Sequence, residues 1–89
     1  MIITFDPAKR DRTLRERGLD FAEAGALFEG RYFTREDDRA DYGETRQISI
    51  GTIRKTVIVI VWTPRSAARH IISMRKANDR ERKRYAAYL

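Results

Sequence analysis

The sequence is organised around one stretch, Thr56-Val57-Ile58-Val59-Ile60-Val61-Trp62-Thr63. Apolar side chains at successive positions are typical of a strand that is buried on both faces, so this stretch predicts the central strand of a sheet. Its apolar run, from Val57 to Trp62, is far shorter than the ~20 residues that a membrane-spanning helix needs. Pro64 lacks a backbone donor, and we expect the strand to end there.

Further strands are predicted on both sides of this stretch. Residues 46–51 alternate between apolar and polar side chains, which indicates a half-buried strand, and a turn around Gly51 and Thr52 then leads into the central strand. The Ile-rich residues 70–75 predict the next strand, and residues 32–34 are a weaker candidate. Because the connections are short, we expect an antiparallel sheet of three to four strands.

Two helices are predicted in the N-terminal part. Asp6 followed by Pro7 is a helix start, and the charged residues 8–17 follow it. Asp20 is placed to cap a second helix over residues 21–28, in which apolar side chains recur at helical spacing. This second helix therefore has an apolar face that must pack against the rest of the protein.

A third helix is predicted at the C-terminus. Asn78 with Glu81 three residues later forms a capping box, and the helix is expected to run to about Tyr88. Residues 2–5 add a short strand at the other end of the chain. Together these elements predict one compact α+β domain over residues 1–89, and 89 residues leave no room for a second domain.

The charge is unevenly distributed. The chain has 19 Lys and Arg residues against 13 Asp and Glu, for a formal net charge of +6. Residues 1–45 contain eight basic and eleven acidic residues, whereas residues 46–89 contain eleven basic and only two acidic ones. This C-terminal surplus indicates a surface that attracts a polyanion or an acidic partner, the alternative being a basic helix that only keeps the protein in solution.

Several kinds of chemistry are disfavoured. The chain has no Cys and one His, which removes disulfides, thiolate nucleophiles and cysteine-based metal sites. The only carboxylate cluster lies within residues 35–44 and is interpreted as a solvated acidic loop rather than a metal site. No Gly-x-Ser-x-Gly motif and no glycine-rich phosphate loop is present, so no cofactor is expected. The N-terminus has no secretion signal, and we expect a cytoplasmic protein with no membrane association.

The positive charge of residues 46–89 suits a protein that cleaves RNA, with the 2′-hydroxyl of the RNA itself as the nucleophile. That reaction needs cations at the phosphoryl oxygens, a base for the 2′ proton and an acid for the departing 5′ oxygen. Guanidiniums match phosphate geometry well. The basic residues that flank the last two strands and cover the last helix are Arg65, Arg69, Arg75, Lys76, Arg80, Arg82, Lys83 and Arg84.

Three side chains are candidates for the acid and base, namely Glu81, Tyr85 and His70. The imidazole of His70 suits proton transfer near neutral pH. However, His70 is expected on the same strand face as Ile72 and Met74, and a packed structural role is the favoured alternative. Trp62 is equally compatible with stacking on an RNA base and with closing the end of the core strand.

The sequence resembles the BrnT family. The resemblance is carried by an ordered set of motifs at similar spacing over nearly the whole chain: Asp6-Pro7-Ala8-Lys9, Arg17-Gly18-Leu19-Asp20-Phe21-Ala22-Glu23-Ala24, Asp41-Tyr42-Gly43-Glu44-Thr45-Arg46, Gly51, Trp62-Thr63-Pro64-Arg65, Ile71-Ile72-Ser73-Met74-Arg75-Lys76-Ala77 and Glu81-Arg82-Lys83-Arg84-Tyr85. The family comprises ribonuclease toxins of bacterial type II toxin–antitoxin modules, with a fold like that of the RelE toxins. The resemblance therefore implies an endoribonuclease that inhibits translation.

The resemblance also implies site residues and partners. The positions that match the ribonuclease surface, expected to be catalytic, are Arg65, Arg75, Glu81, Arg82 and Tyr85. Further RNA contacts are expected from Trp62, Arg69, His70, Lys76, Arg80, Lys83 and Arg84, where His70 replaces an arginine common in the family. The implied partner is a BrnA-type ribbon–helix–helix antitoxin. The implied assembly has two toxins on one antitoxin dimer, and the toxin contacts promoter DNA only through this complex. A non-catalytic basic module that binds nucleic acid or the antitoxin is the alternative.

Overall fold

The computed structural model describes residues 1–89. The strands are β1 (Ile2–Phe5), β2 (Tyr32–Glu36), β3 (Gln47–Ile53), β4 (Thr56–Arg65) and β5 (Ala68–Lys76). The helices are α1 (Pro7–Arg17), α2 (Ala24–Glu29) and α3 (Asp79–Tyr85), with short 3₁₀ turns at Phe21–Glu23 and Ala86–Tyr88. None of the helices combines the length and apolar character that crossing a membrane requires.

The five strands form one mixed sheet in the order β1-β5-β4-β3-β2. The α+β class and the antiparallel pairing of β2 through β5 are confirmed. The expected sheet of three to four antiparallel strands is wrong in detail, because β1 joins the sheet parallel to β5, with Ile2 opposite Ala68 and Phe5 opposite Ile71. This pairing joins the first strand of the chain to the last strand.

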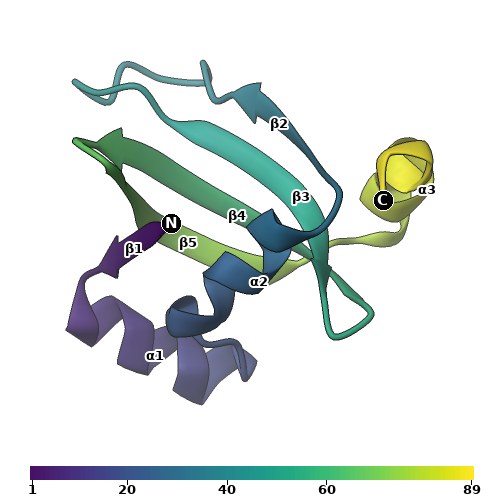
Figure 1. The fold of residues 1–89 in the computed structure, drawn as a ribbon, viewed down its shortest axis with the longest axis horizontal. Coiled ribbons are helices and arrows are strands. Elements are labelled where there is room, and N and C mark those ends of the chain that lie inside the picture. The colour runs from purple at the N-terminus through teal and green to yellow at the C-terminus, as the bar shows by residue number, and fades with distance from the viewer.

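β4 is the central strand, as its apolar run predicts. Ile58, Ile60 and Trp62 face the larger core cluster, which includes the buried residues of α2. Val59 faces the opposite side, in a smaller cluster against which the α3 residue Tyr85 packs. Figure 1 shows α1 and α2 grouped together and α3 apart from them. The sheet therefore has one face covered by α2 and a second face that α3 covers only in part.

The expectation that Pro64 ends β4 is wrong. β4 continues to Arg65, and Pro64 lies opposite Arg69 of β5. The last β4 residue with a partner on β3 is Trp62. Pro64 therefore lies where β4 has a neighbour on one side only, and a missing backbone donor is tolerated at such an edge.

The turn expected at Gly51 and Thr52 lies further along the chain. β3 continues to Ile53, and the hairpin turns at Arg54 and Lys55, whose φ angles are +47° and +68°. Positive φ at both central residues is typical of a two-residue turn between antiparallel strands. Gly51 serves packing instead, because a Cβ at this position would lie 2.8 Å from Cγ of Leu27 on α2.

We expect Gly51→Ala to destabilise the fold. The added methyl group has no room against the fully buried Leu27, and overpacking of this kind costs about 1–3 kcal/mol. Gly25→Ala is the matched control, since its Cβ would meet only Ile3 at an ordinary 3.9 Å, and alanine favours a helix. Chemical denaturation checks both variants, and equal stability of Gly51→Ala and the wild type would contradict the packing role.

The helix starts follow the local signals. The Asp6 side chain accepts a hydrogen bond from the Ala8 N–H at 2.9 Å, and α1 begins at Pro7. The capping box at Asn78 is present in full. The second predicted helix is divided, since a 3₁₀ turn at Phe21–Glu23 precedes α2, but its predicted apolar face is buried.

Candidate active site

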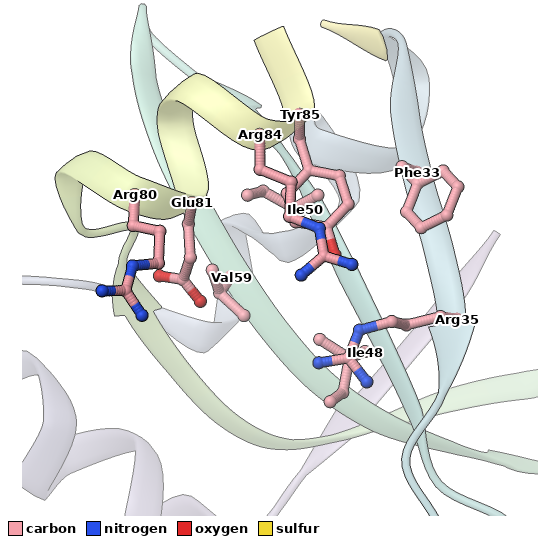
Figure 2. Close-up of a pocket in the computed structure, with 9 residues that line it drawn as sticks. All are labelled: Phe33, Arg35, Ile48, Ile50, Val59, Arg80, Glu81, Arg84 and Tyr85. Carbon is pink, nitrogen blue, oxygen red and sulfur yellow. The ribbon is translucent and has the colours of Figure 1, made fainter.

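A pocket lies between α3 and the partly covered face of the sheet. It has a volume of about 110 Å³ and is lined by Phe33, Arg35, Ile48, Ile50, Val59, Arg80, Glu81, Arg84 and Tyr85. Figure 2 shows the side chains of β2 on one side of this pocket and those of α3 on the other. The floor is apolar and the rim is charged. Such a pocket combines an apolar surface with cations at its edge.

An ion pair between Arg75 and Glu81 stands at this rim. Nη1 and Nη2 of Arg75 donate to the two carboxylate oxygens of Glu81 at 2.7 and 2.8 Å. Arg75 comes from β5, where it lies opposite Val59 of the pocket floor. Glu81 also accepts a bond from the Asn78 N–H at 3.0 Å, so the capping box of α3 holds the carboxylate in place. The start of α3 thereby fixes the direction of the Arg75 guanidinium.

The ion pair shifts the titration of both groups. The hydrogen bonds from Arg75 lower the pKa of Glu81 to about 2, although partial burial opposes the shift. The same bonds raise the pKa of Arg75 above its ordinary value. Glu81 is therefore an ionised carboxylate near neutral pH, which makes it a weak base and excludes it as a proton donor there.

We expect the stabilising effect of Glu81 to disappear in acid. Because its pKa is lowered on folding, the carboxylate adds stability above its unfolded pKa of 4.5 and loses it as the pH falls towards 2. The difference in unfolding free energy between the wild type and Glu81→Gln should therefore shrink between pH 6 and pH ~2.5. Glu29→Gln, at a position without an ion pair, is the control. A Glu81→Gln difference that is the same at both pH values would contradict the pairing.

Tyr85 forms one wall of the pocket. Its ring stacks on Phe33 of β2, with ring centroids 5.2 Å apart and an interplanar angle of 29°. The guanidinium of Arg84 lies 5.6 Å from the Tyr85 ring centre. The Tyr85 hydroxyl makes no hydrogen bond within the chain and so is available to a ligand. The ring of Tyr85 is thus fixed by packing, while its hydroxyl has no hydrogen-bond partner in the protein.

Three guanidiniums surround the pocket without an ion-pair partner. They belong to Arg35 on β2 and to Arg80 and Arg84 on α3 (Figure 2). The positive charge of Arg35 contributes to lowering the pKa of Glu81. Arg35 was absent from the sequence-based site because it falls at the start of the segment interpreted as an acidic loop. The signal that would have found it is alternation along β2, which places Phe33 and Arg35 on one face.

The pocket thus brings together four of the predicted residues, Arg80, Glu81, Arg84 and Tyr85, with Arg75 beside them. Arg82 and Lys83 lie on other sides of α3, and Arg82 Nη1 donates to the Ala77 carbonyl at 2.7 Å. Lys76 lies opposite Ile58, whose side chain faces the α2 side of the sheet. These three basic residues are outside the pocket.

Trp62 and Arg69 lie on the α2 side of the sheet. Trp62 is 9 % exposed, and its Nε1–H donates to Oγ of Ser49 at 2.8 Å. The Arg69 guanidinium lies 4.7 Å from the Trp62 ring centre and 4.2 Å from that of Phe28. Of the two alternatives left open for Trp62, this geometry favours the core position.

Arg65 and His70 lie at the opposite end of the sheet from Arg75. Arg65 is six residues from Val59 along β4, a separation of roughly 20 Å in an extended strand. His70 Nδ1 lies 2.9 Å from Oγ1 of Thr4, and burial together with the charge of Arg65 lowers the pKa of His70. The expected shared face of His70 and Met74 is wrong, because a register shift in β5 places them on opposite faces.

One carboxylate of the segment that was interpreted as a solvated acidic loop is buried. The Asp37 side chain is 1 % exposed and is paired with Arg39 at 2.7 Å, and this contact keeps the pKa of Asp37 well below its usual range. No group of three or more His, Asp or Glu side chains is arranged to hold a metal ion.

The fold and the pocket define a small α+β protein that presents several guanidiniums and an unbonded phenol on one sheet face. A model of the BrnT family, described as the ribonuclease toxin of type II toxin–antitoxin systems, matches residues 5–81. The chain belongs to this family of ribonuclease toxins. Membership of a type II system implies an antitoxin partner. No curated protein matches the chain.

Proposed function

We propose that this protein is a metal-independent endoribonuclease whose active site is the pocket under α3. The observation that carries this proposal is the Arg75–Glu81 ion pair at a pocket rim that also holds Tyr85 and unpaired guanidiniums. Guanidiniums are suited to stabilise the charge that grows on phosphoryl oxygens during cleavage. RNA supplies the nucleophile itself, so a small domain is sufficient.

In the proposed reaction the 2′-oxygen of the RNA attacks the adjacent phosphorus, and the bond from phosphorus to the 5′ oxygen breaks. The 2′ proton passes to a base, and an acid returns a proton to the 5′ oxygen. The products are a 2′,3′-cyclic phosphate and a 5′-hydroxyl end. Arg75, with Arg80 and Arg84 beside it, binds the phosphate and stabilises its charge.

Glu81 and Tyr85 have different roles in this reaction. Glu81 is a positioning residue, because its carboxylate is paired with Arg75. The low pKa of this carboxylate also makes it too weak a base to accept the 2′ proton efficiently. Tyr85 is the acid: its hydroxyl, on a ring that is held against Phe33, donates its proton to the departing 5′ oxygen, and solvent water accepts the 2′ proton. His70 and Arg65 lie at the far end of the sheet and contribute to RNA binding at most.

Membership of the family supports a proposal for the biological role. We propose that cleavage inhibits translation in the cytoplasm and that a BrnA-type ribbon–helix–helix antitoxin neutralises the toxin. The proposed assembly has two toxins on one antitoxin dimer, and promoter DNA is bound only by the complex. An acidic antitoxin surface is the natural complement to the guanidinium rim.

The experiment is incubation of the purified protein with single-stranded RNA in EDTA. Cleavage that continues in EDTA, and that stops when the cognate antitoxin is added, supports the proposal. RNA that is bound with a steep salt dependence but stays intact would instead support the non-catalytic binding module.

A further inference from the structure

A second hollow lies beside the pocket, between α1 and the same face of the sheet. It has a volume of about 430 Å³, and only two of its eleven lining residues, Val61 and Ile72, are apolar. Five cationic side chains line it against two carboxylates: Lys9, Arg12, Arg17, Arg39 and Arg46 against Glu16 and Asp37. This α1 groove is therefore strongly basic, although most of its cations come from the half of the chain that is acidic overall.

The α1 groove adjoins the active-site pocket along the sheet. Val61 of β4 and Ser73 of β5 line the groove and lie opposite each other. Two residues further along the same strands, Val59 and Arg75 form the corresponding pair at the pocket. Two residues along a strand span about 7 Å and return to the same face. In addition, Ile48 of the pocket floor is the β3 partner of Val61. A chain that leaves the pocket along the sheet therefore enters the groove directly.

One helical face of α1 supplies the wall of the groove. Lys9, Arg12, Thr13 and Glu16 line it, at the i, i+3, i+4, i+7 spacing of a single face. α1 buries no residue in the core, so this face is not needed for packing. Lys9 and Arg12 make no ion pair within the chain. Their charge is thus available to a ligand.

A buried carboxylate orients another cation that lines the groove. Nε and Nη2 of Arg39 donate to the two oxygens of Asp37 at 2.7 and 2.8 Å. The Asp37 side chain is 1 % exposed, whereas that of Arg39 is 66 % exposed. The positive charge of Arg39 also acts on Arg75. Arg39 is therefore a preoriented cation between the groove and the active site.

We propose that the α1 groove is a second phosphate-binding site, which holds the single-stranded RNA next to the phosphate that is cleaved. This inference rests on the proposed function and extends its substrate contacts to Lys9, Arg12 and Arg39. A protein partner would need apolar anchors, and protein interfaces are depleted of charge at their centre, unlike this groove. A single-stranded RNA, in contrast, can be bound by cationic side chains alone, because they contact its phosphates.

The test measures binding separately from cleavage. The probe is a 2′-O-methylated RNA of ~10 nucleotides, which lacks the nucleophile, and its affinity is followed by fluorescence anisotropy at several salt concentrations. The double variant Lys9→Ala, Arg12→Ala should bind at least ~10-fold more weakly, and its salt slope should be smaller by about 1.4, as expected for two lost phosphate contacts. Arg15→Ala, on the same helix but outside the groove, should bind like the wild type.

Cleavage gives the second readout. The double variant should raise the KM for a ~10-nucleotide RNA with kcat unchanged, whereas cleavage of a dinucleoside monophosphate, which has no second phosphate to bind in the groove, should not change. Unaltered RNA binding by the double variant, or an equal loss in Arg15→Ala, would overturn the inference, as would a loss confined to antitoxin binding. Probe binding that depends on the groove, in a protein that cleaves no RNA, would leave this site standing and refute the proposed ribonuclease activity alone.

Discussion

Replacing Arg75 with alanine should lower the rate of RNA cleavage by about 100- to 1,000-fold, the typical effect of removing one donor that stabilises a developing oxyanion. Arg75 is the guanidinium that Glu81 fixes in direction, at 2.7 and 2.8 Å, beside the pocket floor. Its loss removes both the charge and the preorientation. The measurement is kcat/KM on a short fluorogenic RNA in EDTA.

The substitution Arg75→Lys separates charge from geometry. Lysine keeps the positive charge but cannot form the two parallel bonds to a carboxylate or a phosphate, so we expect it to recover only part of the activity. Arg15→Ala, a loss of one exposed arginine on α1, controls for a general change in charge. Cleavage at the wild-type rate by Arg75→Ala would remove this residue from the mechanism.

Replacing Tyr85 with phenylalanine should lower kcat by at least about 100-fold while leaving stability almost unchanged. The phenyl ring keeps the stacking on Phe33, at 5.2 Å between centroids, and the hydroxyl that is lost makes no hydrogen bond within the chain. Activity is measured with excess RNA, and stability by chemical denaturation.

The matched control for Tyr85→Phe is Tyr88→Phe. Tyr88 is a neighbouring tyrosine that also contacts Phe33, with centroids 4.7 Å apart, but it does not line the pocket. We expect Tyr88→Phe to retain activity. If Tyr85→Phe cleaved RNA as fast as Tyr88→Phe, proton transfer by the Tyr85 hydroxyl would be refuted.

Local signals in the sequence predicted the elements well. Asp6 and Asn78 begin helices because a capping side chain acts on backbone groups within three residues of itself. The apolar run of β4 identified the central strand for a similar reason, since burial on both faces removes alternation. These features depend on neighbours in the chain.

Features that depend on distant contacts were not predictable. The parallel pairing of β1 with β5 joins residues more than sixty positions apart, and no local pattern encodes it. Gly51 suggested a turn, whereas it is needed for the close approach of Leu27. The turn itself uses Arg54 and Lys55, which are not the residues that usually mark positive φ.

In the candidate site, too, the residues that are neighbours in the chain were predictable, and those brought together by distant contacts were not. Glu81 and Tyr85 were identified because they lie on one predicted helix. Dividing the charge by halves of the chain, however, hid the contribution of the N-terminal half to the same face, namely Arg35 at the pocket and Lys9, Arg12 and Arg39 in the α1 groove. Its acidic residues are partly paired elsewhere, as in the contacts of Asp20 with Arg10 and Glu23 with Arg54.

The most direct test of the central claim is the chemistry of the product ends. Purified protein is incubated in EDTA with one RNA of defined sequence, and the fragments are analysed by mass spectrometry. Attack by the 2′-hydroxyl predicts a 2′,3′-cyclic phosphate on one fragment and a 5′-hydroxyl on the other. The Arg75→Ala variant should form both products much more slowly than the wild type. Intact RNA, or fragments with 5′-phosphate and free 3′-hydroxyl ends, would contradict the mechanism proposed for this pocket.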